Sequence, residues 1–157
     1  MLDALVGGWS VTAITTWQSG FPAAIVQSNN NAGTLGGTQR PNAVDLGALA
    51  TSGDQSARVD GWFNAGALTQ AAPFTLGTLP RTIDVRGPGQ FNIDAGLSKV
   101  VPVTSTMRAM IRFEAINATN TAKFLSPNMS FGSAAFGRIT GQAGFPRQLQ
   151  VMLRLFW

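Results

Sequence analysis

The side chains that could do chemistry in this chain are few, and most of them are charged groups on strand-like segments. The 157-residue sequence contains no Cys and no His, and only seven Asp and Glu residues. The missing residue types exclude thiol nucleophiles, imidazole bases, disulfides and the usual zinc sites. No two carboxylates stand at catalytic spacing on one element, and no serine lies in a nucleophile-elbow sequence. We therefore expect a protein that is not an enzyme and that uses no cofactor.

The main candidate polar site is a group of charged residues on segments where apolar and polar residues alternate. Its members are Asp94, Arg108, Arg112, Glu114 and Arg154. Alternation with a period of two is the pattern of a β-strand, in which successive side chains point to opposite faces. All five residues fall on the polar side of their segments. We expect Asp94 to lie opposite Arg112 or one step away, since cross-strand pairs of opposite charge contribute about 0.2–1 kcal/mol.

The other arginines do not form a basic patch, and the formal net charge is only +4. They stand singly along the chain, at positions 40, 58, 81, 86, 138 and 147. Proteins that bind nucleic acids usually gather lysine and arginine on one face or in one run. We therefore expect no nucleic-acid partner.

The elements that must position the charged residues are strands, because helix-length apolar stripes are absent from the sequence pattern. Period-two segments occur at about 9–18, 21–27, 90–99, 107–117 and 148–157. The connections between them alternate in length. SGFP (19–22) and VVPVTST (100–106) are short turns, whereas 28–89 and 118–147 are long and rich in glycine and asparagine.

Strands of about ten residues joined by alternating short turns and long loops are typical of a membrane β-barrel. An apolar face suits lipid, and a charged face suits a water-filled lumen. Trp9, Trp17 and Trp157 stand at strand ends, where the aromatic girdles of such barrels lie. The alternative is a soluble sandwich or jelly roll, which also alternates but has turns roughly every 8–12 residues. We predict an all-β fold, an antiparallel meander that forms about the last five strands of a transmembrane β-barrel with two long extracellular loops.

Several short stretches in a fixed order carry a resemblance to a known family. They are GGWSVTAITTWQSGFP (7–22), RPN (40–42), WFN (62–64), RGPGQFNIDAGLSK (86–99), MRAMIRFEAINATNTAKF (107–124), AFGRIT (135–140) and PRQLQVMLRLFW (146–157). From about residue 5 to its end, the chain resembles the C-terminal portion of TonB-dependent outer-membrane receptors. It is most similar to the Oar-like group, which carries a carboxypeptidase-regulatory-like domain at the N-terminus.

The resemblance implies a plugged barrel of about 22 strands in the bacterial outer membrane. Such receptors bind a scarce solute outside and move it inward with energy delivered by TonB. Residues 1–157 would be part of that barrel, without the plug domain and the TonB-contacting segment. The C-terminus, VVPVTST and SGFP would be periplasmic, and 28–89 and 118–147 would be outside.

The same resemblance gives roles to the candidate residues. The charged group would line the lumen, either contacting the plug or a solute or only balancing charge. The apolar residues of the last strand would face lipid and form the signal that the outer-membrane assembly machinery reads: Leu149, Val151, Leu153, Leu155 and Trp157. The candidate ligand loop contains Asn29, Asn30, Asn31, Trp62 and Phe63, although the two aromatic residues could equally anchor the loop. The alternative function is a self-contained secreted β-rich module for binding or adhesion.

Overall fold

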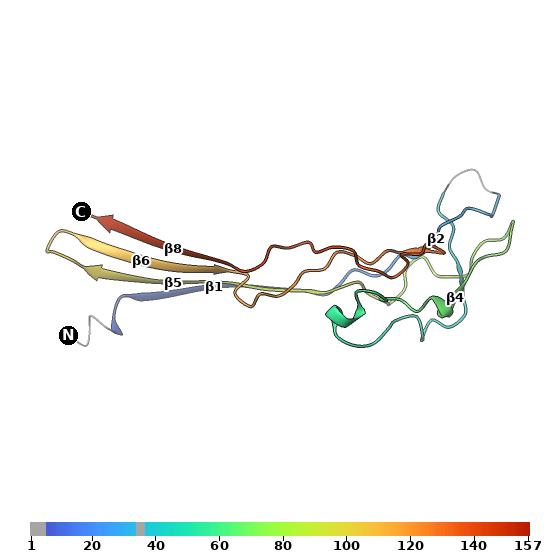
Figure 1. The fold of residues 1–157 in the computed structure, drawn as a ribbon, viewed down its shortest axis with the longest axis horizontal. Helices are drawn as coiled ribbons and strands as arrows, with labels where there is room; N and C mark the ends of the chain where they lie inside the picture. Colours follow the sequence, from blue (N-terminus) through green and yellow to red (C-terminus); the bar gives the residue numbers. More distant parts are fainter. Residues whose placement is uncertain (1–5, 34–36) are drawn as a thin grey trace. The chain divides into compact units, whose positions relative to one another are not determined.

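The computed structural model describes residues 6–33 and 37–157, and Figure 1 shows a chain of strands and irregular segments. The strands are β1 (Trp9–Gln18), β2 (Val26–Gln27), β3 (Asn42–Ala43), β4 (Leu68–Thr69), β5 (Gln90–Pro102), β6 (Arg108–Ile116), β7 (Ser130–Phe131) and β8 (Gln148–Phe156). Two short 3-10 helices, η1 (Gln55–Arg58) and η2 (Ala65–Ala67), lie between β3 and β4. The prediction of an all-β fold with an antiparallel meander is confirmed.

The chain divides into two compact units, which are described separately. The sheet unit consists of the described part of Met1–Gln18 together with Gln90–Lys123 and Gly144–Trp157. The loop unit consists of the described part of Ser19–Gly89 together with Phe124–Ala143. Residues 34–36, which belong to the predicted loop 28–89, lie outside the described residues, as do residues 1–5.

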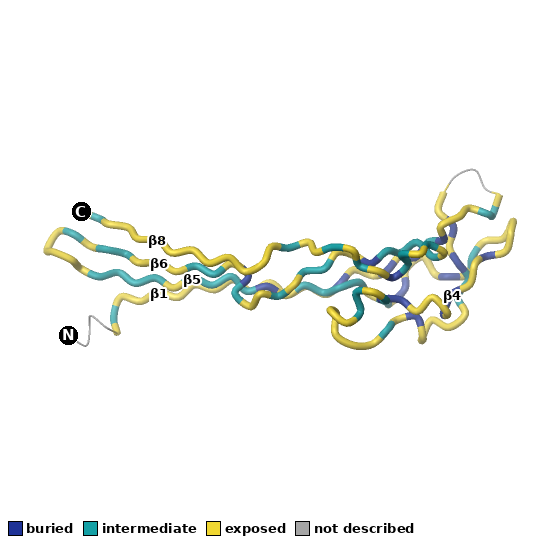
Figure 2. The backbone as a smooth tube through the Cα atoms, viewed as in Figure 1, coloured by how far each residue is buried: buried dark blue, intermediate teal, exposed yellow. Residues whose placement is uncertain are grey.

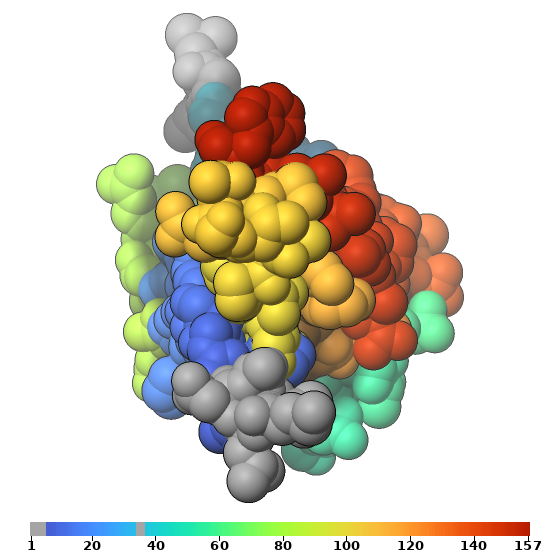
Figure 3. Space-filling model, turned by 90° about the vertical axis from the view of Figure 1, so that its left-hand side faces the viewer, coloured from blue at the N-terminus to red at the C-terminus, as the bar shows by residue number. Residues whose placement is uncertain are grey.

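The sheet unit is a four-stranded antiparallel sheet in the order β1-β5-β6-β8. Aromatic and β-branched residues are frequent in these strands, which suits a pleated surface. The hairpin between β5 and β6 is closed by Thr104, whose hydroxyl accepts a hydrogen bond from the backbone N–H of Met107 at 3.0 Å. Figure 3 views this end of the sheet, with the β5–β6 hairpin in yellow and the C-terminal residues in red.

The predicted sheet strand at 21–27 is wrong. Only Val26–Gln27 is a strand, and it pairs with β7 rather than with the four-stranded sheet. Pro22 has no backbone N–H to give to a ladder. Ala23 and Ile25 are 0% and 2% exposed, and they pack into the core of the loop unit. The alternation in this segment therefore reflects burial in a different core, and β1 pairs directly with β5.

This pairing also corrects the predicted direction of the first strand. Gln18 at the end of β1 lies opposite Gln90 at the start of β5, and Ile116 at the end of β6 lies opposite Gln148 at the start of β8. Both long connections therefore leave and re-enter the sheet at one end. The SGFP segment belongs to this long-connection end and not to the end that carries the β5–β6 turn.

The loop unit has its own apolar core. The core consists of Ala23, Ile25, Leu49, Trp62, Phe63, Ala67, Leu68, Leu79 and Ile83. Phe136 packs on its border, stacked on Phe63 with ring centroids 5.6 Å apart and edge-to-face with Phe131 at 5.5 Å. Gly137 has a φ of +75°, and its carbonyl accepts the backbone N–H of Trp62 at 2.8 Å. The long connections are thus packed structures rather than open loops.

Candidate functional site: a two-faced sheet and its loop unit

The register of the sheet gathers polar residues on one face. In the central row of this face, Thr12 lies opposite Gly96, Gly96 opposite Glu114, and Glu114 opposite Gln150. The five predicted charged residues share this face, because each of them either belongs to this row or lies an even number of residues from it along its strand. They are Asp94, Arg108, Arg112, Glu114 and Arg154. Residues that lie directly opposite each other point to the same side of a sheet. We call this side the polar face.

The opposite side, the apolar face, carries large hydrophobic side chains that nothing in the described structure covers. The predicted lipid-facing residues of β8 lie here, with 73% of Leu149, 66% of Val151 and 66% of Leu153 exposed. β1 and β8 are exposed along almost their whole length (Figure 2). Among the described residues, every buried apolar residue belongs to the loop unit. The sheet therefore has no hydrophobic core of its own.

Leu155 lies in line with these residues, whereas Trp157 differs slightly from its prediction. β8 ends at Phe156, so Trp157 follows the strand rather than closing it. Its side chain is 93% exposed. At the other end of the same face, Trp17 lies opposite Phe91. Aromatic residues thus stand near both ends of the apolar face, which is where a membrane barrel places its girdles.

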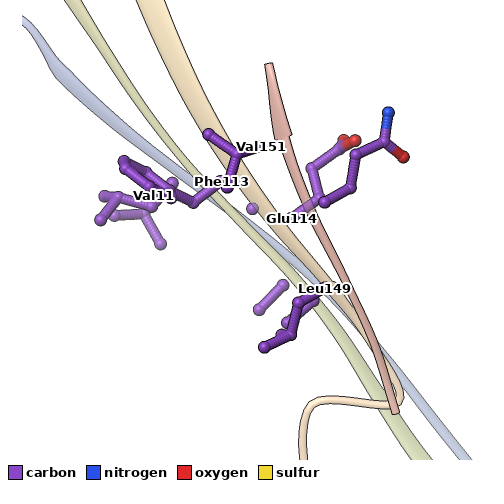
Figure 4. Close-up of a pocket in the computed structure, with 10 residues that line it drawn as sticks. Val11, Phe113, Glu114, Leu149 and Val151 are labelled. Carbon is purple, nitrogen blue, oxygen red and sulfur yellow. The ribbon is translucent and has the colours of Figure 1, made fainter. Parts of the chain in front are cut away.

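A shallow groove of about 420 Å³ crosses the apolar face. Its floor is formed where Ala95 lies opposite Ala115, because two methyl groups leave space between larger neighbours. Val11, Phe113 and Leu149 are among those neighbours, and Figure 4 shows Glu114 pointing away from Val11 and Phe113. The groove is apolar because successive side chains of a strand point to opposite faces, so the polar side chains lie on the other face of the sheet.

The ion pair on the polar face differs from the one predicted. Arg112 lies opposite Ser98. On the same face of β5, Gly96 stands between Ser98 and Asp94, so Asp94 is not the cross-strand neighbour of Arg112. Arg112 instead pairs with Glu114 of its own strand, with 2.6 Å between Nη2 and Oε1. Both side chains are partly exposed, at 42% and 34%. The sequence could not fix this partner, because the turn length that sets the register was not known.

Asp94 does not form the predicted ion pair with Arg112 and instead accepts two hydrogen bonds. Its carboxylate accepts the backbone N–H of Asn117 and the side-chain amide of Asn92, both at 2.8 Å. Asn117 is 5% exposed and has a φ of +52°. Its own side chain donates to the carbonyls of Thr121 and Phe145, each at 3.1 Å. These bonds tie the start of β5 to the two segments that lead into and out of the 124–143 connection.

Two residues of this network were missed by the sequence reasoning, Asn92 and Asn117. The signal for Asn117 was its place directly after an alternating strand. Asparagine tolerates positive φ better than most residues and bonds its own backbone in turns. Lys99 was missed as well. It falls on the apolar face opposite Trp9, and its ammonium lies 4.6 Å from the centre of the indole ring.

The predicted ligand-loop residues separate into two groups. Trp62 and Phe63 are 2% and 4% exposed and belong to the loop core, so their burial favours the anchoring interpretation. The indole N–H of Trp62 donates to the carbonyl of Arg86 at 2.8 Å, and the guanidinium of Arg58 lies 3.9 Å from its ring centre. Burial lowers the pKa of the Arg58 guanidinium below its usual value.

The asparagine group lies nearer the surface, with Asn29 and Asn30 exposed and Asn31 partly buried. The side chain of Asn31 accepts a hydrogen bond from Gln27 at 2.7 Å and donates to the carbonyl of Ala71 at 2.7 Å. Asn31 is therefore part of the loop scaffold. Ligand contact by the three asparagines stays a prediction.

A family model described as an outer-membrane β-barrel domain matches residues 1–150 of this chain. The chain belongs to this family. In an outer-membrane β-barrel domain, one face of each strand meets lipid and the other meets the lumen, which accounts for a sheet whose apolar face is left uncovered. No match was found among curated proteins or among solved structures. No helix in the described part of the chain is long and apolar enough to span a membrane.

Proposed function

We propose that this chain forms part of the barrel wall and the outer loops of a TonB-dependent receptor that takes up a scarce solute across a bacterial outer membrane. The observation that carries the proposal is an open four-stranded sheet with one bare apolar face and all its long connections at one end. A bare apolar face of this kind is stable only against lipid or another apolar surface. We propose transport, and not catalysis, as the activity that this wall serves.

The sheet needs further strands to close. β1 and β8 each have one neighbour in the sheet order, whereas outer-membrane barrels have at least about eight strands and no free edge. We propose that strands outside this chain complete the barrel. The plug domain and the contact with TonB would likewise lie outside residues 1–157, as partners of the polar face and of the receptor as a whole.

The corrected strand directions give a consistent orientation. With the C-terminus in the periplasm, the β5–β6 turn and the start of β1 are periplasmic, and both long connections leave the sheet at its outer end. Short periplasmic turns and long outer loops are the rule in this architecture. The assembly machinery would meet β8 and Trp157 from the periplasmic side.

The alternative of a secreted adhesive module receives less support. A self-contained module must bury one face of its sheet, but the buried apolar residues of the described structure all belong to the loop unit. The loop unit by itself has only two-residue strands.

The experiment is a genetic comparison in the bacterium that makes the protein. Strains lacking the receptor gene, the TonB gene or both are grown with iron chelates, cobalamin, glycans or peptides as the limiting nutrient. We expect the receptor deletion to impair growth on one solute class, the TonB deletion to impair it equally, and the double deletion to add nothing. A receptor-dependent uptake that persists without TonB would contradict the proposal and indicate a passive barrel.

A further inference from the structure

A pocket of about 430 Å³ opens in the loop unit and carries two cations. It is lined by Ala24, Ile25, Val26, Thr38, Arg40 and Arg81. No carboxylate is among these lining residues. Its size lies within the range of about 300–1,000 Å³ that is usual for small-molecule sites.

The walls of the pocket are fixed by backbone contacts. The 24–26 segment is held on one side by the bond from the Gln27 N–H to the Gln39 carbonyl at 2.8 Å. The segment carrying Arg40 lies against the segment that leads to Arg81, since the Leu79 N–H donates to the Pro41 carbonyl at 3.1 Å. The two backbones are so close that a Cβ on Gly77 would lie 1.8 Å from the Arg40 carbonyl oxygen. The pocket is therefore formed before any ligand arrives.

The two guanidinium groups have donors to spare. Arg40 uses Nη1 to donate to the Leu79 carbonyl at 2.8 Å, which fixes the side chain. Within the described part of the chain, most of the five N–H donors of this guanidinium have no further partner. Arg81 is exposed, and no acidic lining residue competes for it. A guanidinium matches the geometry of carboxylate and phosphate oxygens, and it can bind them through two parallel hydrogen bonds.

A second pocket in the loop unit serves as a contrast. It has a volume of about 330 Å³ and is lined in part by Arg58, Arg86 and Asp84. Like Arg40, its arginines donate to protein groups, Arg58 to the Thr51 hydroxyl at 3.1 Å and Arg86 to the Gly20 carbonyl at 3.1 Å. Unlike Arg40 and Arg81, Arg86 also lies 3.9 Å from a carboxylate of its own pocket, that of Asp84. Asp84 adds a negative charge to its lining. An anion is therefore favoured in the first pocket and not in the second.

We propose that the pocket between Arg40 and Arg81 binds the carboxylate or phosphate group of a small anion. The two guanidinium groups hold the oxyanion, the Thr38 hydroxyl adds a donor, and the apolar side chains of Ala24 and Val26 in the lining contact the carbon body of the ligand. The placement of this pocket on the outer side of the membrane rests on the proposed receptor function. The anion site itself does not depend on TonB.

The test is a binding measurement on the receptor that carries this chain, reconstituted in nanodiscs of phosphatidylcholine. Isothermal titration calorimetry follows citrate and inorganic phosphate at low salt. We expect Arg40→Gln and Arg81→Gln each to weaken binding by about tenfold or more, because each change removes a charge-assisted hydrogen bond to the oxyanion. Arg81→Lys keeps the charge but loses the planar fork, so its loss should be intermediate. Arg138→Gln, an equal change of charge elsewhere in the loop unit, is the matched control and should have no effect.

A second arm separates two sources of the oxyanion. Vesicles containing lipopolysaccharide present phosphate on a lipid, whereas citrate and inorganic phosphate are free in solution. An arginine-dependent signal in either arm supports the site and identifies its source. Equal binding by the wild type, Arg81→Gln and Arg138→Gln in both arms would overturn the proposal. If the Arg40 variant does not fold, the result for Arg81→Gln tests the proposal. The folding of each variant is checked by its heat-shifted electrophoretic mobility.

The binding assay and the growth assay fail independently. A receptor that depends on TonB for uptake but shows no arginine-dependent anion binding would retain the proposed function and lose the anion site. Anion binding without any TonB-dependent uptake would do the reverse.

Discussion

The carboxylate of Asp94 accepts the backbone N–H of Asn117 at 2.8 Å, which joins the start of β5 to the segment that follows β6. Replacing Asp94 by alanine leaves that N–H without its partner at a residue that is only 5% exposed. We expect the free energy of unfolding to fall, because a buried donor without a partner is destabilising. Urea unfolding of the folded protein in lipid vesicles measures it. Asp60→Asn, at an exposed carboxylate of the loop unit, is the control, and an equal effect of both changes would contradict a specific role for Asp94.

Asn117 combines a positive φ with three side-chain hydrogen bonds, and two substitutions separate these contributions. Glycine adopts the left-handed conformation without strain, whereas alanine does not. We expect both variants to be destabilised by the lost bonds, and Asn117→Ala to be less stable than Asn117→Gly by about 1 kcal/mol. The same unfolding measurement tests the difference. Equal stability of the two variants would mean that the backbone conformation of residue 117 relaxes.

If the polar face of the sheet faces the water-filled lumen and the apolar face meets lipid, then neighbouring residues of β6 should differ in their exposure to water and to lipid. The natural sequence has no cysteine, so a single introduced thiol reports its own position in this chain. We expect Arg112→Cys to react with a water-soluble maleimide in intact barrels, and Phe113→Cys to react with a lipid-phase probe instead. Strong labelling of residue 112 by the lipid-phase probe would refute the lumen assignment of the polar face.

Trp62 anchors the loop unit through burial and through its bond to the Arg86 carbonyl. Replacing it by alanine should cost about 3–5 kcal/mol within that unit. Because the sheet unit has its own strand pairing, we expect barrel assembly to persist while the loops become sensitive to protease added to intact cells. Phe74→Ala removes an aromatic side chain that is 85% exposed and should leave protease sensitivity unchanged.

Trp157 is the exposed aromatic residue that follows β8, and we expect it to matter for assembly rather than for folding of the sheet. In the full receptor, Trp157→Ala or deletion should lower the amount inserted in the outer membrane more than it lowers synthesis. Quantifying the protein in outer-membrane and total fractions checks this. Trp17→Ala removes another exposed indole, 87% accessible, and serves as control. Wild-type insertion of the Trp157 variant would rule out a signal role.

The strand faces could be predicted well because a strand has a period of two. The alternation in 148–157 and 107–117 correctly separated Leu149, Val151 and Leu153 from Arg112, Glu114 and Arg154, since the backbone itself sends successive side chains to opposite sides. The number of strands in the sheet was harder to predict. Ala23 and Ile25 alternate with the more exposed Ala24 and Val26, as in a sheet strand, but they are buried in the loop core.

The all-β class, the positions of the long strands and the apolar face of each strand follow from the amino-acid sequence alone, because these are local properties of alternating side chains. Three features depend on the folded chain: β1 pairs with β5, Arg112 pairs with Glu114 rather than Asp94, and Trp62 and Phe63 are core residues. Folding also brings Arg40 and Arg81 to one pocket. The physical reason is that alternation reports an extended segment with one buried face, whereas the identity of the covering surface depends on contacts between residues far apart in the chain.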